Sequence, residues 1–131
     1  SLNLHHGRSV PFCFNRKEVK DHGEGGAILG APLKNKVLII DDVITAGTSV
    51  NESMQIIQHA NAKASGVVIA VDRQERGTGE FSAIQEVEKR HNIPVISIIS
   101  LDLLIEYIEN TDRFSKYLND IRKYQENYGI N

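Results

Sequence analysis

The sequence has few of the residues that mark several large classes of protein. Its 131 residues include one cysteine, three prolines and no tryptophan. The single cysteine, Cys13, excludes a disulfide within the chain, and chains without disulfides are typical of a reducing compartment. No apolar run approaches the roughly 20 residues that a helix needs to span a bilayer. We therefore expect a cytoplasmic protein that has no membrane partner.

Positive and negative charges are nearly balanced. The 15 Lys and Arg residues and 17 Asp and Glu residues give a formal net charge of −2. Such a balance offers no argument for binding to nucleic acid, which attracts basic surfaces, and we expect no nucleic-acid partner. The hydrophobic share of 40% is ordinary for a globular protein. Length and composition therefore predict a single domain.

What the sequence does have is an apolar run followed by two acids and a turn of small residues. Residues 37–40, Val-Leu-Ile-Ile, predict a strand that is buried on both faces. Residues 41–44 read Asp-Asp-Val-Ile, and residues 45–49 read Thr-Ala-Gly-Thr-Ser. A helical pattern begins directly afterwards. In an open α/β sheet, ligands bind at such turns, outside the carboxyl ends of the strands.

This turn is suited to a phosphate group. Closely spaced backbone N–H groups, hydroxyls and a helix N-terminus all favour an anion there. Asp41 and Asp42 suit the hydroxyls of a sugar, or a metal ion held through water, so that the whole segment describes a ribose phosphate site. The common loops G-x-x-x-x-G-K-[ST] and G-x-G-x-x-G are absent from the sequence. The alternative is a plain corner whose acids only cap the helix.

The remaining pattern alternates strands with helices. Strands are predicted at residues 10–14, 37–40, 67–71 and 95–99, and helices at residues 49–60, 81–90 and from 101 onward. This alternation predicts an α/β fold with a parallel sheet of βαβ units. Ser49 and Glu52 have the spacing of a capping box, and Ser100 is placed to cap the next helix. Residues 16–33 are rich in glycine and predict a loop that is mobile without ligand.

Three segments match motifs of one known family, in the same order along the chain. Residues 14–25 contain Phe-Asn-Arg-Lys-Glu and Lys-Asp-His-Gly-Glu-Gly, residues 41–48 read Asp-Asp-Val-Ile-Thr-Ala-Gly-Thr, and residues 72–77 read Asp-Arg-Gln-Glu-Arg-Gly. They resemble the mobile catalytic loop, the signature for 5-phosphoribosyl 1-diphosphate (PRPP) and the orotate-binding segment of the orotate phosphoribosyltransferases. The resemblance implies the parallel sheet of the type I phosphoribosyltransferase (PRTase-like) fold. Residues 1–131 would be a partial core domain, the C-terminal part of a longer enzyme.

The resemblance also implies an activity and its participants. The 5-phosphoribosyl group would pass from PRPP to orotate, in pyrimidine biosynthesis, and give orotidine 5′-phosphate and diphosphate. Mg²⁺ would be the cofactor, bound mainly through PRPP rather than by protein ligands. The protein would be a homodimer in which the loop from Arg16 to Leu33 is shared between subunits.

By the same resemblance, each part of the site has candidate residues. Lys20, Asp41 and Asp42 are the catalytic candidates, and Thr45 and Arg73 would contact orotate. Arg73 suits the carboxylate of orotate, because a guanidinium can give a carboxylate two parallel hydrogen bonds. The set implied to bind PRPP is Arg16, Lys17, Lys20, His22, Asp41, Asp42, Val43, Ile44, Thr45, Ala46, Gly47, Thr48 and Ser49.

Three alternatives remain open for the chain as a whole. The accepting base could be one other than orotate, the protein could be a regulator that only senses PRPP, or the chain could be a fragment without activity. For Arg73, the alternative is a plain ion pair with Asp72, Glu75 or another acid at the surface.

Overall fold

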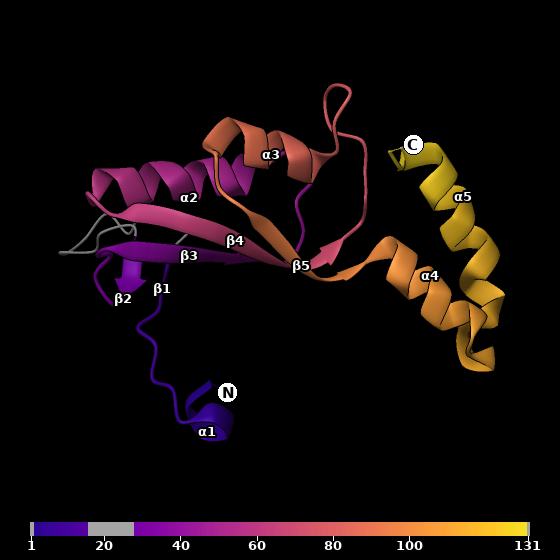
Figure 1. Cartoon of the computed structure of the whole chain (residues 1–131), viewed down its shortest axis with the longest axis horizontal. Coiled ribbons are helices and arrows are strands. Elements are labelled where there is room, and N and C mark those ends of the chain that lie inside the picture. The colour runs from indigo at the N-terminus through magenta and orange to yellow at the C-terminus, as the bar shows by residue number, and fades with distance from the viewer. Residues whose placement is uncertain (1, 16–27, 131) are drawn as a thin grey trace, which may run out of the picture. The chain divides into compact units, whose positions relative to one another are not determined.

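The computed structural model describes residues 2–15 and 28–130, and the chain divides into two compact units between Lys34 and Asn35. The first unit contains a short helix and an antiparallel pair of strands (Figure 1): α1 (Leu2–His6), β1 (Cys13–Asn15) and β2 (Ile28–Gly30). Gly30 has a φ of 115°, and a Cβ there would lie 2.5 Å from the carbonyl oxygen of Phe12. Only glycine therefore fits at the end of this pair.

Two expectations for this unit are corrected. The strand predicted at residues 10–14 begins later, at Cys13. Residues 28–30 form β2, although the glycine-rich pattern predicted a loop throughout residues 16–33. A strand of three residues is too short to show a period of two, and its pairing with β1 is decided by tertiary contacts. The rest of the predicted loop, residues 16–27, lies outside the described residues.

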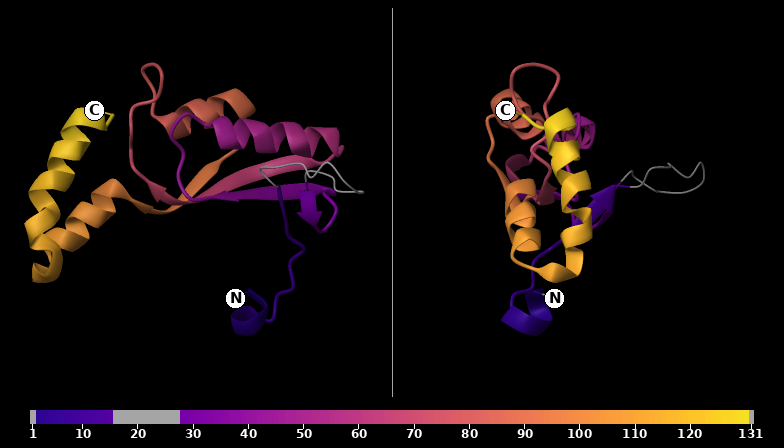
Figure 2. Two further views of the ribbon diagram at one scale, coloured as in Figure 1. Left: turned by 180° about the vertical axis from the view of Figure 1, so that it is seen from behind. Right: turned by 90° about the vertical axis from the view of Figure 1, so that its right-hand side faces the viewer.

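The second unit is built on a parallel sheet with the strand order β3 (Lys36–Asp41), β4 (Lys63–Asp72), β5 (Val95–Ser100). Helix α2 (Thr48–His59) connects β3 to β4, and helix α3 (Ala83–His91) connects β4 to β5. Both helices lie on the same face of the sheet, as the views from opposite sides show (Figure 1 and Figure 2). The predicted α/β fold with a parallel sheet of βαβ units is confirmed.

The face of the sheet under α2 and α3 carries the core of this unit. Apolar side chains of both layers are buried there: Ile39, Val67 and Ile69 of the strands and Val50, Ile57 and Val87 of the helices. On the other face, four apolar side chains are between 52% and 77% exposed: Leu38, Ile40, Ile96 and Ile98. The prediction that residues 37–40 are buried on both faces is therefore wrong. Successive side chains of a strand point to opposite faces, and α2 and α3 cover one of them.

The chain continues from β5 into three helices: α4 (Leu101–Glu109), the 3₁₀ helix η1 (Asp112–Tyr117) and α5 (Leu118–Tyr128). Ser100 caps α4 as predicted, because its Oγ accepts a hydrogen bond from the N–H of Leu103 at 3.4 Å. The last residues return to the loop after β4, where the N–H of Ile130 donates to the carbonyl oxygen of Gln74 at 2.9 Å. Among the described helices, none is long and apolar enough to cross a membrane.

Candidate functional site

The turn after β3 lies at the carboxyl edge of the sheet and is fixed to the neighbouring strand. The carbonyl oxygen of Asp42 accepts hydrogen bonds from the N–H groups of Ala70 and Val71 in β4, at 2.9 and 3.2 Å. Farther along the turn, Ile44 and Gly47 are buried, and the two residues between them are exposed. The turn is therefore anchored at both ends and faces solvent in its middle.

Gly47 allows helix α2 to begin where it does. This residue is the N-cap of α2 and has a φ of 69°, in the left-handed region. A Cβ at this position would lie 2.8 Å from Cγ2 of Val87 in α3. A side chain therefore fits neither the dihedral angle nor the space, and glycine is required for the turn to approach α3 this closely.

The first turn of α2 has no side-chain cap within the described part of the chain. The predicted capping box of Ser49 and Glu52 is wrong, since the helix already begins at Thr48. The hydroxyl of Ser49 instead donates to Oδ2 of Asp41 at 2.6 Å. N–H groups left without a side-chain acceptor at a helix N-terminus suit an anionic ligand.

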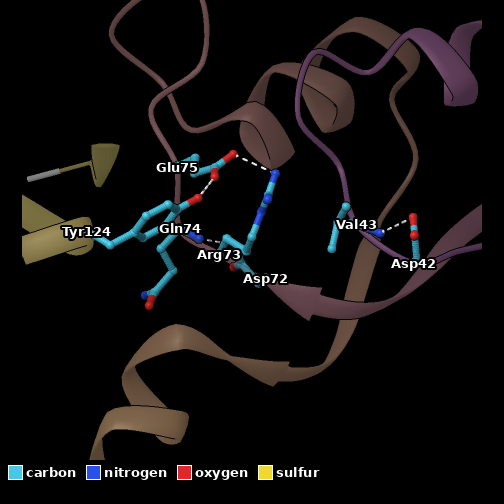
Figure 3. A network of polar contacts seen from close by, with 7 residues as sticks. All are labelled: Asp42, Val43, Asp72, Arg73, Gln74, Glu75 and Tyr124. Atoms are coloured by element: carbon cyan, nitrogen blue, oxygen red, sulfur yellow. Dashed lines mark hydrogen bonds and ion pairs between the residues drawn. The ribbon is translucent and has the colours of Figure 1, made fainter. Parts of the chain in front are cut away.

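The two acids of the turn have different surroundings. Asp41 is half-buried; its Oδ1 accepts from the N–H of Asp42 at 3.0 Å and its Oδ2 from the hydroxyl of Ser49. Asp42 is exposed, and its Oδ1 accepts from the N–H of Val43 at 2.7 Å (Figure 3). Both oxygens of Asp41 therefore support the turn. The carboxylate of Asp42 is the better placed of the two to accept hydrogen bonds from ligand hydroxyls.

A histidine of α3 supports the start of α2. Nε2 of His91 lies 2.6 Å from Oδ1 of Asn51, whose N–H donates to the carbonyl oxygen of Gly47 at 2.9 Å. Burial of the imidazole lowers the pKa of His91, and the positive charge of Arg90 lowers it further. His91 is therefore held in its neutral form to lower pH than an exposed histidine, next to the helix end that follows the turn.

The second part of the candidate site is the loop after β4. Its first residue, Arg73, lies beside Glu75, with Nη2 at 3.0 Å from Oε2 (Figure 3). The other carboxylate oxygen, Oε1, accepts a hydrogen bond from the hydroxyl of Tyr124 in α5. Asp72 instead accepts from the N–H of Gln74, at 2.8 Å. Of the ion pairs considered for Arg73, the one with Glu75 is therefore present.

Side chains from α4 and α5 hold this loop in place. Gln74 has a φ of 53°, and its amide both donates to Oδ2 of Asp102 at 2.7 Å and accepts from the N–H of Asp102 at 2.9 Å. Gln125 donates to Oδ1 of the same carboxylate at 2.7 Å. Sequence reasoning missed this network. The partners lie 28 and 49 residues apart, and no local pattern links them.

The structure brings the described site candidates to one edge of the sheet. The turn with Asp41, Asp42 and Thr45 follows β3, and Arg73 follows the adjacent strand β4. The candidates of the glycine-rich loop lie outside the described residues: Arg16, Lys17, Lys20 and His22. Residues 2–15 and 28–130 contain no group of three or more His, Cys, Asp or Glu side chains that could hold a metal ion.

Curated proteins match the chain along nearly its whole length, whereas no family model matches it. It is 56% identical over 130 residues to the orotate phosphoribosyltransferase of Klebsiella pneumoniae (strain 342). It is 58% identical over 132 residues to that of Stutzerimonas stutzeri (strain A1501). Each match covers 99% of this chain and 61% of the relative, so the chain spans about three fifths of the length of these proteins.

Solved structures have the same fold. The crystal structure of orotate phosphoribosyltransferase from Francisella tularensis is 35% identical, with a TM-score of 0.76, and the match covers 98% of this chain and 60% of that one. The UMP synthase of Leishmania donovani is 22% identical, with a TM-score of 0.71 over 97% of this chain and 26% of that one, and bears on the fold alone.

Proposed function

Because this chain belongs to the orotate phosphoribosyltransferase family over the part of the family's length that it covers, we propose that its protein transfers the 5-phosphoribosyl group of PRPP to orotate. The bond from C1 of the ribose to diphosphate breaks, and a bond from C1 to a ring nitrogen of orotate forms. The products are orotidine 5′-phosphate and diphosphate. This step would serve pyrimidine biosynthesis in the cytoplasm.

The observation that carries the proposal is the position of the turn and of Arg73 at the ends of adjacent parallel strands. In the proposal, residues 45–49 hold the 5-phosphate through backbone N–H groups and hydroxyls. The exposed carboxylate of Asp42 accepts hydrogen bonds from the ribose hydroxyls. Arg73, beyond the end of the next strand, holds the base. A ligand with a phosphorylated ribose and an acidic base would meet all three in this order.

The acids of the turn also suit the charge that develops during transfer. As the bond to diphosphate breaks, positive charge grows on the ribose, and a carboxylate already fixed nearby stabilises it without reorganising. Asp42 would contribute this directly, and Asp41 by holding the turn in shape through Asp42 and Ser49. Removal of one fixed charge of this kind from a closed site costs about 2–4 kcal/mol of transition-state stabilisation.

Arg73 can hold the carboxylate of orotate while it keeps its contact with Glu75. A guanidinium carries five N–H donors, and Glu75 lies against one nitrogen, Nη2. The side chain of Arg73 is 33% exposed, so part of it is open to a ligand. Neutral bases offer no carboxylate to this group, and Arg73 would therefore select orotate.

The proposal extends to the participants that the described residues do not include. Mg²⁺ would arrive on the diphosphate oxygens of PRPP, with Asp41 and Asp42 able to contact its water ligands, and would neutralise charge on the departing diphosphate. The loop cations would bind the diphosphate from the partner subunit of a homodimer: Arg16, Lys17, Lys20 and His22.

The test is the release of diphosphate by the protein in its natural length, with PRPP, orotate and Mg²⁺, before and after Arg73→Ala. We expect the substitution to raise the KM for orotate and leave the KM for PRPP within about twofold. Loss of a charge-assisted pair suggests about 2–5 kcal/mol, or roughly 30- to several-thousand-fold in kcat/KM for orotate. Arg73→Lys restores the charge without the planar fork, so it should recover only part of the loss.

The matched control is Arg76→Ala, in the same loop, because Arg76 donates to the carbonyl oxygen of Gly129 at 3.3 Å and so fixes the loop. It should change the two KM values about equally or not at all. Diphosphate release that does not depend on orotate would contradict the proposed substrate. Unchanged kinetics in Arg73→Ala would instead remove Arg73 from the base site.

A further inference from the structure

The carboxylate of Glu75 is shared between Arg73 and a residue of the C-terminal helix. One oxygen lies 3.0 Å from Nη2 of Arg73, and the other accepts from the hydroxyl of Tyr124 (Figure 3). The side chain of Glu75 is 16% exposed. A carboxylate that is mostly buried needs hydrogen-bond partners for its oxygens, and Arg73 and Tyr124 supply them. With both oxygens engaged, its orientation is fixed.

The orientation of Glu75 bears directly on Arg73. A long guanidinium side chain that is one third exposed has many rotamers, and only a few present its N–H groups to one place. Contact with an oriented carboxylate selects among them. Nε of Arg73 is buried and has no hydrogen-bond partner within the described part of the chain, so Glu75 is the contact that holds the guanidinium.

The loop itself does not need the Tyr124 hydroxyl to keep its fold. Gln74 is tied to Asp102 by its side chain, and its carbonyl oxygen accepts from the N–H of Ile130. The N–H of Arg76 donates to the carbonyl oxygen of Tyr128 at 2.8 Å. These bonds are independent of the Glu75 carboxylate. The hydroxyl of Tyr124 therefore affects mainly the orientation of the Glu75 carboxylate and, through it, the orientation of Arg73.

We propose that Glu75 and Tyr124 are positioning residues for the base site: the C-terminal helix α5 aims Arg73 at the carboxylate of orotate through Glu75. This assignment rests on the proposed function. It makes α5, far along the sequence from the PRPP turn, a determinant of base affinity. The residues of α5 need not touch either substrate.

The test compares Tyr124→Phe with Tyr128→Phe in the protein in its natural length. Tyr124→Phe keeps the ring, which lines one surface hollow together with Leu101, Leu104 and Ile121, and removes the hydroxyl. Loss of a hydrogen bond to a charged group predicts about a tenfold rise in the KM for orotate, with the KM for PRPP nearly unchanged and a modest fall in the melting temperature. Tyr128, whose ring centroid lies 5.0 Å from that of Tyr124 and which is 59% exposed, is the control and should leave both KM values unchanged on substitution.

Two further variants keep the outcome clear. Glu75→Gln removes the negative charge of the ion pair that holds Arg73, so it should also raise the KM for orotate selectively. In an Arg73→Ala background, Tyr124→Phe should have no further effect, because its role passes through Arg73. Equal changes in both KM values, or a full effect of Tyr124→Phe without Arg73, would overturn the assignment.

An unsubstituted protein that releases no diphosphate with orotate would overturn the proposed function and this assignment together. An active protein whose kinetics do not change on Tyr124→Phe would overturn the assignment alone.

Discussion

The two loops at the carboxyl edge of the sheet are held in different ways. In the turn after β3, every side-chain bond of the acids is to a residue at most eight positions away. In the loop after β4, Gln74 and Glu75 bind side chains that lie 28 and 49 residues farther along the chain. The acid side chains of the first loop are therefore held by local partners, and the side chains of the second loop by helices α4 and α5.

This difference separates two tasks in the proposed site. A phosphate and a ribose are common to many substrates, and a turn between a strand and a helix can bind them. In the proposed site, the choice of base depends on the orientation of Arg73, which contacts Glu75, and Glu75 in turn contacts Tyr124 of α5. Substitutions that act on one loop and spare the other therefore test the comparison.

The largest effect is expected from Gly47→Ala, in the turn after β3. The left-handed φ of 69° costs a non-glycine residue about 1–2 kcal/mol, and a Cβ 2.8 Å from Val87 adds an overlap of about 1–3 kcal/mol. We expect a loss of about 2–5 kcal/mol in the free energy of unfolding, measured by urea denaturation. Gly79→Ala is the control, because its Cβ would meet only Glu86, at 3.8 Å. A similar loss for the two variants would contradict the steric argument.

The second effect concerns Gln74, the left-handed residue of the other loop. Gln74→Ala removes two hydrogen bonds with Asp102 but keeps a Cβ at a φ of 53°, so it should cost about 1–3 kcal/mol. Gln74→Gly loses the same bonds and relieves the dihedral strain, so it should cost about 1 kcal/mol less. Denaturation of the two variants side by side measures the difference. Equal costs would mean that the left-handed conformation of residue 74 carries no strain that glycine relieves.

The contrast between the loops also explains what could be predicted from the sequence. The alternation of strands and helices and the turn at residues 41–49 depend on local patterns, and the sheet and the position of the turn followed from them. The network around Arg73 depends on where α5 returns, and Tyr124 carries no local sign of its contact with Glu75. The burial of residues 37–40 was overestimated because an apolar run does not tell whether one or both faces of a strand are covered. Spacing alone likewise suggested a capping box at Ser49, where the N-cap is Gly47.

A smaller effect on stability tests whether Ser49 and Glu52 form a capping box. Ser49→Ala removes the hydrogen bond to Asp41 and should cost about 0.5–1.5 kcal/mol, because the pair is exposed and water can replace part of it. Glu52→Ala should change the free energy of unfolding by less than about 0.5 kcal/mol, since Glu52 takes no part in a cap. A larger loss for Glu52→Ala than for Ser49→Ala would restore the capping box.

The smallest effect is the contribution of His91 to the pH dependence of stability. Burial lowers the pKa of His91 in the folded protein below its usual value of 6.5, so the unfolded chain binds the proton at a pH where the folded chain does not. The unfolded state then holds more protons in the range below 6.5, and stability falls as the pH drops through that range. His91→Gln should make this fall shallower, measured as urea midpoints between about pH 7 and pH 5. His59→Gln, at the exposed end of α2, is the matched control and should leave the slope as it is. An equal change in slope for the two variants, or a steeper fall for His91→Gln, would contradict the lowered pKa of His91 in the folded protein.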